Sequence, residues 1–356
     1  MPISLIIGTN NFDRSRTDVL YTTTFDISAN TFSIPIPFSC PCGNPGFFNF
    51  SSADETPSAD NTNLLYCADE SKDGMLHTFN VSPQGLHLLS STPAGIDPCH
   101  VVASPTLIAT SNYSNGTVAL HSTSTPPTLL HTLDLNPLYT TLSPPPTLHD
   151  RQESSHCHQS TFTSHFLLVC DLGSSCVVTF DLSQSPPTIA STYRPSPNSG
   201  CRHLAIVGED VYIMLELVSA VSHCKLDPAT GELKEVAILP LLPSGELGET
   251  RAHHRGGGGI VASPSGDFIY ATLRNTVPGV VVALKRDLET GKISVHKRAS
   301  SGGEIPRCLV CVGEDLIMVA NQEDRKVCCL KGKGDLTLLA EVGGFDCGVA
   351  FVGELR

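Results

Sequence analysis

Short apolar runs that end in a polar or charged residue recur along the chain. Seven such runs end at or next to the following positions: Asn10, Glu70, Asn112, Asp171, Glu216, Arg274 and Asn321. From Glu70 onward the spacings between these positions are 42, 59, 45, 58 and 47 residues, a period near 50. A period of about 40–50 residues with several strands per repeat is typical of a β-propeller blade. The pattern therefore predicts seven blades.

Each repeat has room for about four strands. In one repeat, residues 96–102 lead into LIATSNY, then into the alternating segment GTVALHS and then into PTLLHTL, with Gly, Pro, Asn and Asp between the segments. Alternation with period two indicates strands and leaves little room for helix. We predict an all-β chain that folds over residues 1–356 as one seven-bladed β-propeller, with about four antiparallel strands per blade.

The two ends of the chain fit each other. The first repeat opens on what is a second strand elsewhere, and residues 345–353 (FDCGVAFVG) have the character of an unpaired first strand. We predict that this C-terminal strand completes the blade begun by residues 3–35. Such pairing of the N- and C-terminal strands leaves no open sheet edge.

Composition narrows the possible partners and compartment. The chain carries 29 Gly and 26 Pro, which suits short strands joined by turns, and its formal charge of −13 argues against nucleic acid, because phosphate binding needs clustered Lys and Arg. No run reaches the roughly 18–20 apolar residues of a membrane span, and the N-terminus lacks a secretion signal. We expect a cytoplasmic monomer that begins at its first residue, has no membrane partner and keeps its 14 cysteines reduced.

Propeller geometry brings the polar ends of the strands together. In each blade the first strand begins, and the antiparallel second strand ends, on the same side. We therefore expect one solvated mouth of the central channel to be lined by the side chains at these positions: His100, His158, Arg202, His203, Arg307, Glu70, Asn112, Asp171, Glu216, Arg274 and Asn321. A polar ring of this kind is suited to a small ligand.

The motifs at these positions resemble a known family. They are GIDPCHVV (95–102), SNYSNGTV (111–118), SHCHQSTF (155–162), CDLG (170–173), GCRHLA (200–205), MLEL (214–217), SPSGDFIYATLR (263–274) and GGEIPRCLV (302–310). Taken in this order, they resemble the seven-bladed propeller lactonases, which group 6-phosphogluconolactonases with 3-carboxy-cis,cis-muconate cyclases. The resemblance implies that His158, Arg202, Glu216 and Arg274 are catalytic and that neither a metal nor an organic cofactor takes part.

Opening a lactone needs a base for water, donors for the oxyanion and a cation for the anionic group of the substrate. Either Glu216 or His158 would be the base and the other the proton donor, while Arg202 and Arg274 would bind a small anionic lactone or carboxylate. We assign His100, His156, His203 and Arg307 to substrate binding. Hydrogen bonding between blades is an alternative for His100, His203 and Arg307, and a loop position is an alternative for His156.

Other interpretations of the sequence stay open. The preferred function is hydrolysis of an anionic sugar lactone, because the PCH, NY and DLG motifs are closer to the lactonase branch; the alternatives are a lactone-forming cyclase or isomerase and a non-catalytic binding propeller.

Asp171 is expected to cap a turn before Gly173. His156 and His158 have the spacing of a metal-binding pair on one strand face, but we predict no metal. Residues 251–259 (RAHHRGGGG), which end in the glycine run 256–259, are expected to form a flexible loop without an assigned role.

Overall fold

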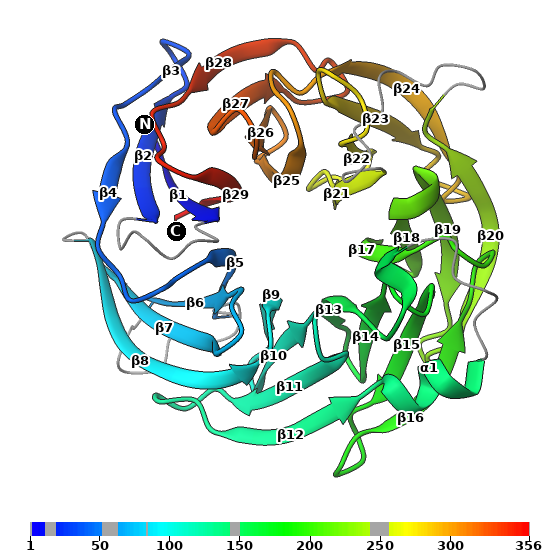
Figure 1. The fold of residues 1–356 in the computed structure, drawn as a ribbon. Helices are drawn as coiled ribbons and strands as arrows, with labels where there is room; N and C mark the ends of the chain where they lie inside the picture. The colour runs from blue at the N-terminus through cyan, green and yellow to red at the C-terminus, as the bar shows by residue number, and fades with distance from the viewer. Residues whose placement is uncertain are drawn as a thin grey trace.

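A ring of antiparallel sheets surrounds a central axis, which is called the channel in propellers (Figure 1). The computed structural model describes residues 2–10, 19–51, 63–82, 85–142, 150–242 and 256–355. Within these ranges the sheets are seven in number, and each is a propeller blade whose first strand lies nearest the channel. In blade 1 both β3 and β4 pair with β2. The predicted all-β, seven-bladed fold is confirmed.

The blades follow the chain in order. Blades 1 to 4 contain β29 (Gly348–Glu354), β1 (Ile3–Asn10), β2 (Leu20–Asp26), β3 (Thr31–Phe32) and β4 (Ile36–Phe38); β5 (Pro45–Phe50), β6 (Asn63–Asp69), β7 (Gly74–Ser82) and β8 (Gly85–Gly95); β9 (Pro98–Ala103), β10 (Leu107–Asn112), β11 (Thr117–Ser122) and β12 (Leu129–Asp134); and β13 (Cys157–Phe162), β14 (Phe166–Asp171), β15 (Cys176–Asp181) and β16 (Thr188–Tyr193). Blades 5 to 7 contain β17 (Cys201–Val207), β18 (Asp210–Leu215), β19 (Ala220–Leu226) and β20 (Leu233–Pro240); β21 (Gly257–Ala262), β22 (Phe268–Leu273), β23 (Val280–Arg286) and β24 (Ile293–Ser300); and β25 (Pro306–Val312), β26 (Leu316–Asn321), β27 (Lys326–Lys331) and β28 (Leu338–Val342). The helices in the described ranges are α1 (Asn136–Leu142), η1 (Asp150–Gln152) and η2 (Glu216–Val218).

The second strand of a blade is apolar on both faces because neighbouring blades cover both. Every residue of β14, β18, β22 and β26 is buried. A strand buried on both faces has a continuous apolar run, whereas a half-buried strand alternates. These second strands are therefore the recurrent runs that set the period of the sequence.

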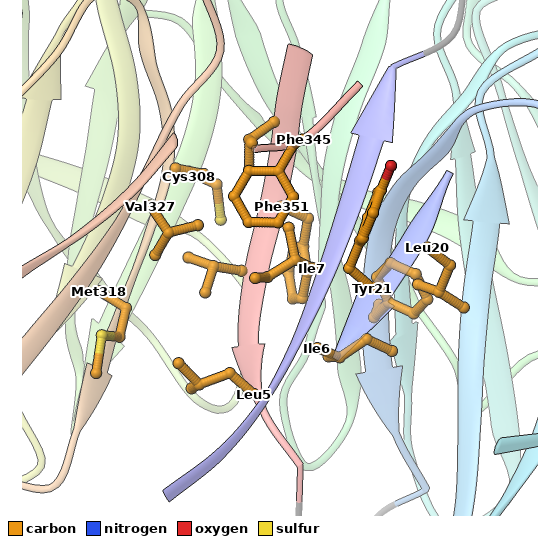
Figure 2. Packing of buried hydrophobic residues seen from close by; sticks show 14 of the residues in the cluster. Leu5, Ile6, Ile7, Leu20, Tyr21, Cys308, Met318, Val327, Phe345 and Phe351 are labelled. Atoms are coloured by element: carbon orange, nitrogen blue, oxygen red, sulfur yellow. The ribbon is translucent and has the colours of Figure 1, made fainter. Parts of the chain in front are cut away.

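The C-terminal strand closes the ring as predicted. β29 pairs antiparallel with β1, from Leu5 opposite Glu354 to Asn10 opposite Gly348. Figure 2 shows Leu5, Ile6 and Ile7 of β1 packed among side chains of β29, β2 and blade 7, which together form one buried cluster. Closure thus joins the two ends of the chain through apolar packing as well as through backbone hydrogen bonds.

The structure corrects two expectations from the sequence, one for the glycine run and one for a pair of cysteines. Residues 257–259 belong to β21, so the glycine run is largely strand and not loop; residues 251–255 lie outside the described residues. Cys40 and Cys42 form a disulfide, which corrects the expectation of reduced thiols for this pair, while the other twelve cysteines are free. None of the helices in the described ranges is long and apolar enough to span a bilayer.

Candidate functional site

Three guanidinium groups from different parts of the chain surround one buried carboxylate, that of Glu216. Arg274 Nη2 lies 2.5 Å from Oε1, and Nη2 of Arg151 contacts the same oxygen. Arg202 Nε lies 3.0 Å from Oε2 as an ion pair without hydrogen-bond alignment, so Oε2 has no hydrogen-bond partner among the described residues. We call these four residues the arginine cluster. Three cations against one carboxylate leave the cluster itself with a net positive charge.

β-Bulges place the residues of the first strands at the channel. In blades 2 to 7 the pairing of the first with the second strand shifts register near the start of the first strand. A bulge takes a residue out of the ladder and re-aims its side chain. The residues skipped by these shifts in blades 4 to 7 are His158, Arg202, His203, Gly258, Gly259 and Arg307.

The glycine-rich strand β21 holds two of the arginines through its backbone. Arg202 Nη1 donates to the Gly258 carbonyl oxygen at 3.0 Å, and Arg274 donates to the Gly257 carbonyl oxygen from Nε at 3.1 Å and from Nη2 at 2.9 Å. A Cβ atom at Gly256 would overlap the Glu216 carbonyl oxygen. Within the strand, a Cβ atom at Gly258 would overlap Thr272 Oγ1 and the Pro306 carbonyl oxygen, so glycine allows this backbone to approach its neighbours closely.

Electrostatics fix the charge states of the cluster. Burial favours the neutral acid, but the positive charges of the three guanidinium groups, led by that of Arg274, outweigh it and lower the pKa of Glu216 to about 2. Burial, with the charge of Arg274, lowers the pKa of Arg202 to about 9. At neutral pH Glu216 is therefore a carboxylate, Arg202 stays charged, and Glu216 is a weak proton acceptor.

Three neutral histidines lie beside the cluster. The ring centroid of His203 is 4.9 Å from that of His158 and 6.0 Å from that of His100. Burial and the charge of Arg202 lower the pKa of His158 and His203 well below 6.5, and that of His100 to about 3. His158 Nδ1 also lies 3.9 Å from Cys99 Sγ. All three imidazoles are thus uncharged at neutral pH.

His156 lies at the edge of the site, where its ring contacts Glu153 and Tyr113. Its Nε2 lies 3.0 Å from Glu153 Oε1, its Nδ1 lies 3.0 Å from the carbonyl oxygen of Tyr113, and its ring stacks on the Tyr113 ring at 4.3 Å. Both ring nitrogens therefore already have partners. Among the described residues, no three or more His, Cys, Asp and Glu side chains are arranged to hold a metal ion.

The predicted polar ring is only partly formed. Arg307 of blade 7 pairs with Glu70 of blade 2 at 2.6 Å, near the channel. Asn112, Asp171 and Asn321 instead hold turns and neighbouring segments: Asn112 Nδ2 donates to the Ala94 carbonyl oxygen, Asp171 accepts from Ser155, Ser174 and the His156 amide, and Asn321 bonds to Ser301. The expectation that all these residues line the mouth is wrong for these three, whereas the turn-capping role of Asp171 is confirmed.

The cluster is also more buried than a solvated mouth implies. Glu216 is 1% exposed, Arg202 2% and Arg274 6%, whereas the side chain of Arg151 is 33% exposed. Arg151 was not among the predicted residues because it lies in the 3₁₀ helix η1, away from any strand end, and no sequence pattern links it to Glu216 65 positions later. Arg151 is therefore the member of the cluster most open to a ligand.

Cavities accompany the channel at both ends. One of about 510 Å³, at the end where the first strands begin, is lined by Tyr113 and by polar residues that include the carboxylates of Glu70, Asp73 and Asp97; among the described residues, the members of the arginine cluster do not line it. A larger one of about 630 Å³ lies at the opposite end and is lined mainly by Phe48, Val261, Val310, Phe351 and their neighbours. We place the candidate site at the first end, because the charged and titratable groups gather there.

Known proteins resemble the chain along almost its whole length. The family described as "Lactonase, 7-bladed beta-propeller" matches residues 6–347. A 6-phosphogluconolactonase of Bacillus subtilis (strain 168) is 26% identical over 255 residues, which cover 69% of this chain and 70% of that relative. The crystal structure of a protein from Lactobacillus plantarum superimposes with a TM-score of 0.82 at 22% identity and full coverage of both chains. A periplasmic gluconolactonase of Pseudomonas aeruginosa gives 0.82 at 19% identity, covering 100% of this chain and 99% of its own.

The two solved structures support the fold alone at these identities. Fold and site define the class of the protein as a seven-bladed β-propeller with a charged cluster at one end of its channel. The family match identifies it further: the chain belongs to the seven-bladed β-propeller lactonase family.

Proposed function

We propose that the chain is a lactonase that opens an anionic sugar lactone at the arginine cluster without a metal or organic cofactor. The observation that carries the proposal is the excess of positive charge around the buried Glu216 carboxylate. A low-dielectric site with fixed cations favours an anionic substrate and the oxyanion that forms during hydrolysis. The name of the Bacillus subtilis relative, 6-phosphogluconolactonase, and the match to the lactonase family support the same reaction class.

In the proposed reaction, water attacks the lactone carbonyl carbon and the guanidinium groups stabilise the resulting oxyanion. His158 takes the proton from the attacking water. The C–O bond of the ring then breaks, the ring oxygen receives that proton, and the product is an open-chain hydroxy acid, which ionises to a carboxylate. Burial and the charges of nearby arginines both lower the pKa of His158; negative charge on the oxyanion offsets the arginine charges, so the basicity of His158 rises as water attacks.

Glu216 has a different role in this proposal. With a pKa of about 2 it accepts a proton poorly, so of the two candidate bases we favour His158. Glu216 instead orders the three arginines by pairing with each of them. Its Oε2 remains an acceptor for water or for a substrate hydroxyl.

Arg151 is proposed to bind the distal anionic group of the substrate, because it is the most exposed guanidinium of the cluster. Arg151→Ala is expected to lower kcat/KM for 6-phosphogluconolactone by about 10–150-fold, since a hydrogen bond to a charged group contributes about 1.5–3 kcal/mol. The effect on unphosphorylated gluconolactone should be much smaller. The measurement is the rate of δ-lactone opening for both substrates, corrected for spontaneous hydrolysis.

Arg298→Ala is the matched control, because Arg298 lies on the outer strand β24 and donates to the Leu241 carbonyl oxygen at 2.8 Å. It should leave both rates unchanged. A wild-type rate no higher than the spontaneous background with either lactone would contradict the lactonase proposal and leave the lactone-forming cyclase to be tested. Equal losses on both lactones would contradict the assignment of Arg151 to the phosphate.

The pH dependence of the rate tests the role of His158. Because the pKa of His158 is lowered, its imidazole is already unprotonated at pH 6. Activity should fall only at lower pH, where His158 becomes protonated and can no longer act as the base. We expect kcat/KM for unphosphorylated gluconolactone, which has no phosphate group that titrates near pH 6, to be flat between pH 6 and 8 after subtraction of the spontaneous rate. An acid limb with a midpoint near 6.5 would show an unshifted histidine and would contradict the proposed environment of His158.

A further inference from the structure

Tyr113 lies at the edge of the arginine cluster with its ring fixed on two sides. It follows β10, and its ring stacks on His156 with centroids 4.3 Å apart and planes 13° apart. The ring of His158 meets it edge-on at 5.8 Å. The Tyr113 amide donates to the Asp97 carbonyl oxygen at 3.0 Å, so the backbone is held as well.

The hydroxyl group of this fixed ring lacks a hydrogen-bond partner in the described part of the chain. Its oxygen is also buried. A buried polar group left unpaired destabilises the folded protein, so such a group calls for an explanation. The packing of the ring accounts for the position of Tyr113, but it does not account for the oxygen.

The surroundings of the hydroxyl point to a ligand. Tyr113 lines the cavity of about 510 Å³ at this end of the channel. Burial raises the pKa of Tyr113, and the charges of Arg151, which lowers it, and of Glu216, which raises it, act on the same hydroxyl. On balance the pKa is raised, and the group is a hydrogen-bond donor at any pH at which the protein would work.

We propose that the Tyr113 hydroxyl donates a hydrogen bond to the carbonyl oxygen of the bound lactone and so joins the arginine cluster in stabilising the oxyanion. This inference rests on the proposed lactonase function. A donor fixed before the reaction strengthens its hydrogen bond as negative charge develops on the acceptor. Loss of the hydroxyl should therefore act on kcat more than on KM.

The test compares Tyr113→Phe with Tyr66→Phe. Tyr66 lies on β6, is 1% exposed, and its hydroxyl is likewise buried without a partner in the described part of the chain. Each change removes one unpaired hydroxyl and keeps the ring. Both variants should unfold at or slightly above the wild-type temperature. Only Tyr113→Phe should lower kcat, by about 100-fold, as loss of one oxyanion donor does.

Two results would overturn the inference. A Tyr113→Phe enzyme with wild-type kcat shows that the hydroxyl does not contact the reacting oxygen. A Tyr113→Phe protein that is clearly less stable than Tyr66→Phe shows that the hydroxyl has a structural partner. In either case lactone opening by the wild type would leave the proposed function standing.

Direct binding separates this inference from the lactonase proposal. If the wild type opens no lactone, calorimetric titration with 6-phosphogluconate, the open-chain hydroxy acid, replaces the kinetic assay. A weaker Kd in Tyr113→Phe alone would retain Tyr113 as a ligand-binding residue although the proposed reaction has failed. Equal affinity in all three proteins, or no binding by the wild type, would overturn the inference.

Discussion

Glu216→Gln is expected to lower the free energy of unfolding by about 3–5 kcal/mol, since removing one partner of a buried ion pair leaves uncompensated charge. The neutral amide would leave three cations without their shared anion, two of them, Arg202 and Arg274, almost fully buried. The arginines should move apart, and lactone hydrolysis should be lost together with stability. Urea denaturation at pH 7 and the rate of lactone opening measure the two effects.

Acid unfolding gives the same prediction an independent measurement. The pKa of Glu216 is lowered from 4.5 to about 2 in the folded protein, so its contribution to stability is complete above pH 4.5 and is lost as the pH falls toward 2. That difference corresponds to about 3 kcal/mol. The dependence of unfolding free energy on pH in this window should be shallower in Glu216→Gln than in the wild type.

Glu341→Gln is the control for both measurements. Glu341 is 53% exposed and pairs with Lys326 at 3.2 Å, so its loss should change stability by less than about 1 kcal/mol. If Glu216→Gln proved as stable as Glu341→Gln at pH 7, the buried carboxylate would not be the anion that holds the cluster together.

The same burial changes what is expected of the arginines. A solvated mouth predicts that Arg202→Ala and Arg274→Ala lower activity at constant stability. Because both guanidinium groups are buried on Glu216 and on backbone carbonyl oxygens, either substitution removes structural contacts as well. Activity loss in these variants therefore cannot be separated from unfolding, and the more exposed Arg151 is the better position for a functional test.

The fold could be predicted from the sequence because one strand type dominates the pattern. The second strands are covered on both faces, so they stand out as continuous apolar runs at a regular spacing. Closure by β29 was predictable for a related reason: the first repeat lacks an inner strand, and the last segment of the chain supplies it.

The site was less accessible to sequence reasoning, because polar residues at equivalent strand ends serve different purposes. Asn112 and Asp171 bond to nearby backbone and side chains, while Glu216 at the corresponding position meets three arginines. Residue type and spacing are similar in the two cases, and only the tertiary arrangement separates them. Arg151 also escapes detection because its partner is brought to it by packing and not by a repeat.

Gly258→Ala is expected to lower lactone hydrolysis by about 100-fold and the free energy of unfolding by about 1–3 kcal/mol, although one methyl group is the only change. The added Cβ would overlap Thr272 Oγ1, which accepts the Gly259 amide at 2.8 Å, and the Pro306 carbonyl oxygen. The strand must then shift, and with it the carbonyl oxygens that hold Arg202 and Arg274.

Gly343→Ala is the control, because it replaces a glycine by alanine at a position where the added methyl group has space. Neither Gly258 nor Gly343 has the positive φ that disfavours alanine, and the nearest described atom to a Cβ at Gly343 would be the Arg325 carbonyl oxygen at 3.8 Å. The Gly343 variant should match the wild type in kcat/KM and in urea denaturation. Equal behaviour of the two variants would mean that β21 can move without disturbing the arginines. If only Gly258→Ala loses activity and stability, the glycine run is explained: glycine is needed there because the backbone of β21 holds Arg202 and Arg274 through its carbonyl oxygens.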